Sequence, residues 1–301
     1  MAKAVLTTKI DPTYDDLPEQ RYHFPRTYLR QVEAAKGDFV IYYEPRRSSG
    51  DLSSRGGRQV YFATARIVDV RPDPSRADHF YADVDAYLDF ARPVPFHEGQ
   101  HYYESAVQRD DGATNKGAFG RAVRALPDSE YDAILSAGFA TVLGETSAEP
   151  LGLPTTGGFA DPPATFERPI VERIVARPFR EAAFSGSIKA AYDDTCAFTG
   201  LKIVNGGGRS EVQAAHIRPV TASGPDSLRN GIALCGTVHW MFDRGLISIA
   251  DNHELLFAKG KVTEQVVSLL NSDRRLLAPS RPDQAPHPMF LRWHRENVFK
   301  G

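Results

Sequence analysis

The segment from residue 196 to 249 constrains the fold more than any other part of this 301-residue chain. It contains His216, Asn230 and His239, which follow one another at offsets of 14 and 9 residues. The apolar runs around them predict a strand, a loop, a second strand and a helix. An imidazole titrates near neutrality and can take a proton from water, so His216 is the candidate general base. Asp243 lies one helical turn after His239, and at this spacing both side chains share a helix face and can bind one cation.

Four motifs make this segment resemble a known nuclease family. They are Cys196-Ala-Phe-Thr-Gly200, Ala215-His216-Ile-Arg-Pro219, Asn230-Gly-Ile-Ala-Leu-Cys235 and His239-Trp-Met-Phe-Asp243. They are similar to the HNH endonucleases, which have the ββα-metal fold, and among these to the subgroup with an Ala-His-Ile-x-Pro core. By this resemblance, His216 activates water and Asn230 holds either the loop or the His216 ring in position. His239 is then a metal ligand, with Asp243 beside it.

Two departures from the family pattern affect the metal chemistry. Many HNH enzymes carry Asp or His directly before the general base, where this chain has Ala215, so Asp243 is the candidate replacement ligand. Many relatives also hold a structural zinc with two Cys-x-x-Cys pairs. This chain has only Cys196 and Cys235, neither of them in such a pair, and we therefore predict no structural zinc. One His, one carboxylate and phosphate oxygens suit Mg²⁺ or Mn²⁺.

Charge and cysteine content indicate which half of the chain suits nucleic acid and in which compartment the protein works. Residues 1–167 carry 18 Lys and Arg against 25 Asp and Glu, whereas residues 168–301 carry 18 against 13. The basic half is the half with the nuclease-like motifs, as contact with phosphate requires. Two cysteines exclude a disulfide framework, and no run reaches the ~18 apolar residues of a membrane span. We expect a cytoplasmic protein without a membrane partner.

The chain reads as an α+β protein with two domains. Apolar runs of strand length lie at residues 38–43, 60–70 and 79–90. Gly, Pro, Thr and Ser dominate residues 144–168, which predicts a linker. The expected N-terminal domain therefore covers residues 1–143, and the expected nuclease domain covers residues 169–301.

The N-terminal domain resembles the PUA superfamily. The resemblance rests on Tyr22-His-Phe-Pro-Arg-Thr-Tyr28, Gly37-Asp-Phe-Val-Ile-Tyr-Tyr43 and the strand of residues 57–68. This superfamily includes EVE and SRA-like domains, which are small β-barrels, and several of them take a flipped modified base into an aromatic cage. Flipping requires aromatic faces for stacking. The candidate cage residues are Phe24, Tyr28, Tyr42, Tyr43 and Phe62.

Arginine residues near the motifs are candidate contacts for the DNA backbone, because guanidinium groups bind phosphate through paired hydrogen bonds. Those that flank the nuclease motifs are Arg218, Arg229 and Arg244. Those in one Gly/Ser-rich loop of the N-terminal domain are Arg46, Arg47, Arg55 and Arg58. For each of them, a solvated surface position is the alternative.

A PUA-like domain fused to an HNH domain resembles the modification-dependent restriction endonucleases. The resemblance implies a type IV-like enzyme that recognises 5-methylcytosine or 5-hydroxymethylcytosine in double-stranded DNA by base flipping. It would hydrolyse phosphodiester bonds with a divalent metal, in defence against phage. One HNH site cuts one strand, so a double-strand break requires a homodimer or two binding events. Two alternatives remain: an N-terminal domain that senses RNA or another ligand, and a non-catalytic protein that binds modified DNA.

Overall fold

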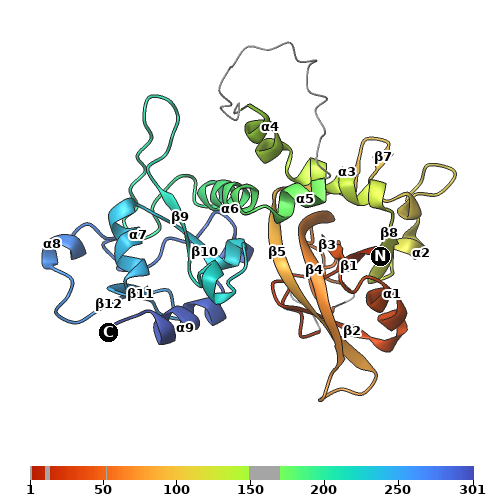
Figure 1. The fold of residues 1–301 in the computed structure, drawn as a ribbon, viewed down its shortest axis with the longest axis horizontal. Coiled ribbons are helices and arrows are strands. Elements are labelled where there is room, and N and C mark those ends of the chain that lie inside the picture. The colour runs from red at the N-terminus through yellow and green to blue at the C-terminus, as the bar shows by residue number, and fades with distance from the viewer. Residues whose placement is uncertain (1, 11–13, 52, 149–169) are drawn as a thin grey trace, which may run out of the picture.

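The computed structural model describes residues 2–10, 14–51, 53–148 and 170–301. It has an N-terminal lobe built on a six-stranded sheet and a C-terminal lobe built on short two-stranded sheets and helices (Figure 1). The expected mixture of helices and strands is confirmed. Within the described ranges, none of the helices combines the length and the apolar character needed to cross a bilayer.

The strands of the large sheet follow the order β2-β5-β4-β3-β1-β8. Only β1 and β3 pair in parallel among them. The three strands predicted in this region are confirmed as β3, β4 and β5. The strand bounds are β1 (Lys3–Thr7), β2 (Arg21–Pro25), β3 (Phe39–Glu44), β4 (Val60–Pro72), β5 (His79–Pro95) and β8 (Val123–Leu126), with β6 (His97–Glu98) and β7 (His101–Tyr102) as a separate pair. The helices of this lobe are α1 (Leu29–Ala34), α2 (Lys116–Phe119), α3 (Asp128–Gly138) and α4 (Ala140–Ala148).

The large sheet curls so that its two edges approach each other. The hydroxyl of Tyr22, on edge strand β2, donates to the carbonyl oxygens of Thr7 and Ala122, at 3.2 and 3.3 Å, near the opposite edge. An apolar cluster fills the inside of the curl, and Val32 of α1 packs into it. A curled sheet is compatible with the expected PUA-like barrel, which stays a prediction.

Three of the predicted cage residues belong to the hydrophobic core, and for them the prediction was wrong. Successive residues of a strand point to opposite faces of the sheet. Tyr42 accordingly joins Phe24 in the inner cluster, whereas Tyr43 joins the cluster on the outer face, so the two tyrosines cannot line one pocket. All three side chains are at most 1% exposed. Tyr28 is half-buried, and its hydroxyl accepts a hydrogen bond from the backbone of Ala122.

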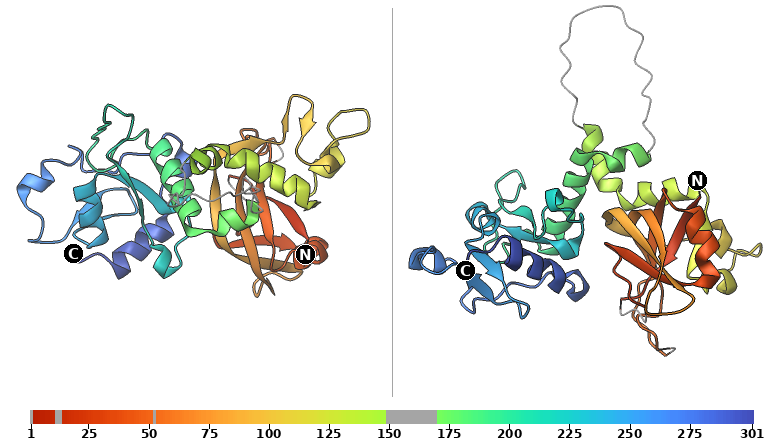
Figure 2. Two further views of the ribbon diagram at one scale, coloured as in Figure 1. Left: turned by 45° about the horizontal axis from the view of Figure 1, so that its top comes forward. Right: turned by 60° about the horizontal axis from the view of Figure 1, so that its bottom comes forward.

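Helix α6 (Arg177–Ala191) belongs to both lobes. Its first half packs on the outer face of the large sheet through Phe179 and Ala183. Its second half packs in the core of the C-terminal lobe through Phe184 and Ile188. Figure 2 shows from two further sides that α6 and the preceding α5 (Ile170–Val175) lie where the lobes meet. The two helices are separated near Pro178, since α5 ends just before it and this proline occupies the first turn of α6.

The predicted linker is helical in its first residues, because α4 extends to Ala148. The Gly/Pro-rich remainder, residues 149–168, lies outside the described residues. The linker and the domain boundaries derived from it therefore stay predictions, while α6 gives the lobes a direct connection.

The C-terminal lobe begins with the predicted strand, loop, strand and helix, which are confirmed. Strands β9 and β10 pair antiparallel, with Gly231 opposite His216, and β11 and β12 form a second antiparallel hairpin. The bounds are β9 (Gln213–His216), β10 (Gly231–Leu234), α7 (Gly236–Asp243), β11 (Ile247–Ile249), β12 (Leu255–Phe257), α8 (Glu264–Val267) and α9 (Pro288–Asn297).

Replacing Phe179 with Ala tests the shared role of α6. The Phe179 ring is 5% exposed and meets the Phe139 ring edge-on, with centroids 5.3 Å apart. We expect Phe179→Ala to lower the free energy of unfolding by about 3–5 kcal/mol, as truncation of a buried Phe does. Urea titration of the full chain measures it. The control Leu269→Ala removes a side chain that is 58% exposed and should change little. Equal stability of both variants would mean that α6 is not packed on the sheet.

Candidate active site

His216, Asn230 and His239 belong to the neighbouring segments β9, β10 and α7 and the turns between them. His216 ends β9, Asn230 ends a single helical turn before β10, and His239 lies on α7. His216 and His239 line one cleft of about 630 Å³, whose other walls come from α6 and from the turn at residues 219–221. The antiparallel pair and the following helix thus bring together two histidines that are 23 residues apart in the sequence.

The ring of His216 is fixed at one edge and one face. Its Nε2 lies 2.9 Å from Oδ1 of Asp226. Burial raises the pKa of the Asp226 carboxyl, but the hydrogen bond with His216 and the positive charge of Arg180 outweigh it and hold this pKa below its usual range. An ionised carboxylate only accepts hydrogen bonds, so Nε2 carries the proton and Nδ1 keeps its lone pair. The ring of Phe184 stacks on the imidazole with centroids 3.8 Å apart.

Arg180 connects the His216–Asp226 pair with the N-terminal sheet. Its guanidinium lies 2.7 Å from Oδ2 of Asp226. It also donates to the carbonyl oxygens of Ala86 and Tyr87 in β5, at 3.0 and 2.6 Å. Ala86 has a φ of 48°, and this interruption of the strand lets two successive carbonyls face one guanidinium. The candidate general base is therefore supported from the other lobe.

Asn230 holds the loop between the two strands. Its Oδ1 accepts from the backbone amide of Arg218, and its Nδ2 donates to the carbonyls of Arg218 and Pro225, each at 2.9 Å. The side chain is fully buried. Of the two roles that the resemblance implies for Asn230, these contacts favour the loop over the His216 ring.

His239 and Asp243 form a pair of donors that fits a divalent cation. The Nδ1 of His239 lies 2.8 Å from the amide oxygen of Gln213, a contact that suits a proton on Nδ1 and a lone pair on Nε2. That Nε2 lies 3.5 Å from Oδ2 of Asp243, whose side chain is 57% exposed. Across the described ranges, no group of three or more His, Cys, Asp and Glu is arranged to hold a metal ion. Water and phosphate oxygens would complete the coordination of a metal held by this pair.

Cys196 and Cys235 are free thiols that hydrogen-bond to each other. The bond from Cys235 lowers the pKa of Cys196, and the same bond raises the pKa of Cys235. Cys196 is buried in the core of the C-terminal lobe, and Cys235 is half-buried. The absence of a structural zinc stays a prediction.

Two arginines predicted to contact the DNA backbone lie between the lobes. The guanidinium of Arg58 donates from Nε and Nη2 to Oε2 of the buried Glu44, at 2.8 and 2.5 Å, and its backbone amide donates to Oε1 at 2.7 Å. Arg229 lies 3.5 Å from Oε1 of the buried Glu19. Each guanidinium thus lies beside a buried carboxylate, while the Arg58 and Arg229 side chains are still 27% and 28% exposed. Contact of these two arginines with the DNA backbone stays a prediction.

The other predicted arginine contacts differ in exposure. Arg218 donates from Nε to the carbonyl of Ala222 at 2.7 Å, and its guanidinium lies over the Trp293 ring, 5.6 Å from the centroid. It therefore stabilises the loop after β9. The remaining four are exposed, and their contacts with DNA stay predictions: Arg46, Arg47, Arg55 and Arg244.

Three polar residues of the site were missed in the sequence, namely Asp226, Gln213 and Arg180. Asp226 stands in the turn Gly224-Pro-Asp-Ser227, which reads as an ordinary loop signal. Gln213 is three residues before His216 on the same strand, a spacing that marks no known ligand. Arg180 has no sequence signal, because its backbone partners lie more than 90 residues away.

His294 of α9 anchors the helix that carries His239. Its Nε2 bonds to the carbonyl of Phe242 at 3.1 Å, and its Nδ1 accepts from the hydroxyl of Ser248 at 2.9 Å. Its ring stacks on Phe242 with centroids 3.8 Å apart. Burial lowers the pKa of His294 from 6.5 to about 4. The end of α7 is thus held by a neutral imidazole.

The low pKa of His294 predicts a pH dependence of stability. The unfolded chain binds the proton first, so stability present above about pH 6.5 is lost as the pH falls toward about 4. We expect this residue to account for a loss of about 2 kcal/mol between pH 7 and pH 5. Urea unfolding of the wild type and His294→Gln at both pH values measures it, with the exposed His101→Gln as control. Identical pH dependence in the wild type and His294→Gln would contradict the assignment.

Residues 196–250 match the model of the HNH endonuclease family, which covers all the motifs of the site. No curated protein sequence matches this chain.

One similar solved structure, a modification-dependent TagI restriction endonuclease, is 15% identical with a TM-score of 0.32, over 98% of this chain and 81% of that one. Another, the type IV phosphorothioation-dependent restriction endonuclease ScoMcrA, is 13% identical with a TM-score of 0.21, over 98% and 53%. TM-scores of this size are too low to assign this chain the fold or activity of either protein. The segment with His216, Asn230 and His239 is thus similar to an HNH endonuclease domain.

Proposed function

We propose that this protein is a metal-dependent DNA endonuclease that cuts DNA containing modified cytosine. The observation that carries the nuclease assignment is the His216–Asp226 pair. Asp226 fixes the proton of His216 on Nε2, and the free lone pair on Nδ1 belongs to a ring that lines the same cleft as His239. The match of residues 196–250 to the HNH endonuclease family supports the same assignment.

In the reaction, Nδ1 of His216 takes a proton from water as that water attacks the phosphorus in line. Asp226 stabilises the imidazolium that forms, because its carboxylate accepts the Nε2 hydrogen bond. His239 and Asp243 would hold the divalent cation, Mg²⁺ or Mn²⁺, which supplies positive charge to the scissile phosphate and the leaving 3′-oxygen when bound. Lys189 also lines the cleft and places a cation near the path of the backbone. The bond from phosphorus to the 3′-oxygen breaks, and this oxygen takes a proton from solvent, so the products carry 5′-phosphate and 3′-hydroxyl ends.

The N-terminal lobe is the candidate reader of the modified base in double-stranded DNA. Its curled sheet is compatible with a PUA-like domain, and its aromatic residues suit stacking of a flipped base. Tyr28 and Phe62 are the predicted cage residues that stay available, since both are half-buried, and Phe62 also lines a cavity between the lobes. The homodimer needed for a double-strand break belongs to this proposal as well.

Cleavage of matched substrates tests the proposed function. We expect the full chain with Mg²⁺ or Mn²⁺ to cut duplexes containing 5-methylcytosine or 5-hydroxymethylcytosine faster than the same duplexes with plain cytosine. Gel electrophoresis of duplexes labelled on one strand at a time also shows whether one strand or both are cut. Equal rates on modified and plain DNA would support a nuclease whose N-terminal lobe senses RNA or another ligand. No cleavage of any duplex would support a non-catalytic binding protein.

His216→Ala should reduce cleavage by about 10²–10⁴-fold, which is the usual contribution of a general base. Binding of DNA should remain close to wild type, because the imidazole acts only on water in the transition state. Single-turnover cleavage and fluorescence anisotropy measure the two effects. His101→Ala, at an exposed position of β7, is the matched control and should retain full activity. Cleavage by His216→Ala at the wild-type rate would remove the catalytic assignment.

A further inference from the structure

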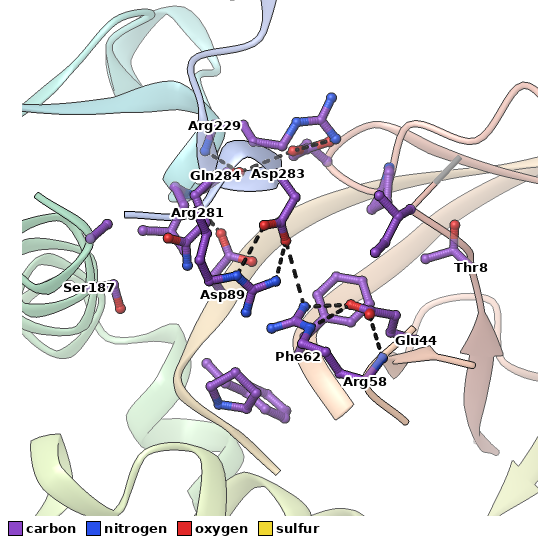
Figure 3. A pocket seen from close by; sticks show the side chains of 18 of the residues that line it. Thr8, Glu44, Arg58, Phe62, Asp89, Ser187, Arg229, Arg281, Asp283 and Gln284 are labelled. Atoms are coloured by element: carbon purple, nitrogen blue, oxygen red, sulfur yellow. Dashed lines mark hydrogen bonds and ion pairs between the residues drawn. The ribbon is translucent and has the colours of Figure 1, made fainter. Parts of the chain in front are cut away.

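A second cavity, of about 360 Å³, lies between the two lobes. Sites for small molecules range from ~300 to 1,000 Å³, so its size suits a single base or nucleotide. Figure 3 shows a chain of ion pairs across it, from Arg281 and Asp283 of the C-terminal lobe to Arg58 and Glu44 of the N-terminal lobe. A ligand in this cavity would therefore touch both lobes at once.

Glu19 lines this cavity, and only one of its two carboxylate oxygens has a hydrogen-bond partner. Its side chain is 1% exposed. Oε1 accepts from the hydroxyl of Ser227 at 3.1 Å and lies 3.5 Å from Arg229. Oε2 is buried and has no hydrogen-bond partner in the described part of the chain. An unpaired buried acceptor is costly, so a ligand that donates a hydrogen bond to Oε2 would be stabilised.

Aromatic side chains line the same cavity. Phe62 is half-buried, and its ring lies against that of Tyr42 with centroids 5.9 Å apart. Tyr87 also lines the cavity, and its hydroxyl donates to Asp89 at 2.7 Å. The cavity thus combines aromatic rings with a carboxylate that needs a donor.

We infer that this cavity binds a cytosine-type base, with the ring against Phe62 and the exocyclic amino group donating to Glu19. A carboxylate accepts a hydrogen bond from the N4 amino group of cytosine, whereas thymine presents a carbonyl oxygen at the same place. Stacking on an aromatic ring adds affinity without regard to the base. The inference rests on the proposed function, in which the base comes from a DNA duplex. A free cytidine nucleotide offers the same chemistry.

The cavity also adjoins the segment that supports His216. Residues 227–229 form one wall of the cavity, and they join Asp226, which holds His216, to Asn230, which holds the loop after β9. Asp89 in the opposite wall accepts from the backbone amide of Leu228 at 2.7 Å. A ligand wedged between the walls therefore contacts the segment whose two ends support the active site.

The test measures binding by the full chain in the presence of a chelator, so that no DNA is cut. The probes are duplexes with 5-methylcytosine, 5-hydroxymethylcytosine or plain cytosine, and free 5-methyl-dCMP, dCMP and dTMP. The variants are Glu19→Gln, which replaces one acceptor oxygen by a donor, and Phe62→Ala. Phe80→Ala is the matched control, because Phe80 is also half-buried against the inner cluster but does not line the cavity. Thermal unfolding checks that each variant is folded.

We expect Glu19→Gln and Phe62→Ala each to weaken binding of the modified duplex by about tenfold, within the range for one base contact or one stacked base. Phe80→Ala should bind like the wild type. If both cavity variants bind the modified duplex as tightly as the wild type does, the cavity is not the base site, although the proposed function stands. If the wild type does not distinguish the duplexes but binds dCMP over dTMP through Glu19, the cavity binds a free nucleotide and the modified-DNA function fails. If the wild type shows neither preference, the inference about the cavity and the proposed function both fail.

Discussion

The buried ion pair between Arg180 and Asp226 is the interaction on which the site depends. Asp226 orients the candidate base His216, while Arg180 is held by two carbonyls of β5 in the other lobe. The two side chains are 15% and 8% exposed, so water screens their attraction poorly. Removal of one partner from such a pair would leave the other charge buried and uncompensated. The position of the base is therefore a property of the whole chain, not only of the residues that resemble an HNH domain.

The two active-site histidines have complementary protonation because their partners differ. Asp226 fixes the proton of His216 on Nε2 and leaves Nδ1 as a base, whereas the amide oxygen of Gln213 favours the proton of His239 on Nδ1 and leaves Nε2 as a ligand. A hydrogen bond to one ring nitrogen determines what the other nitrogen can do. One imidazole is thus suited to a proton and the other to a cation.

The local part of this arrangement could be predicted from the sequence. The strands and helix around His216 and His239 follow from apolar periodicity, and the i, i+4 spacing of His239 and Asp243 follows from helix geometry. Contacts between distant segments could not be predicted. Arg180 meets β5 only because α6 packs on both lobes, and an arginine in a helix carries no sign of that. Composition also misled the prediction at Tyr42 and Tyr43, because their aromatic character suggested a cage while strand alternation places them on opposite faces of the sheet.

The protonation state of the His216 ring tests the central claim most directly. Long-range ¹⁵N–¹H spectra of the histidine rings distinguish the two neutral forms, and comparison with His216→Ala assigns the signal. We predict the form with the proton on Nε2 in the wild type and a mixture of forms in Asp226→Asn, whose amide can accept or donate. A wild-type ring with its proton on Nδ1 would contradict the account, because that nitrogen could not then take a proton from water.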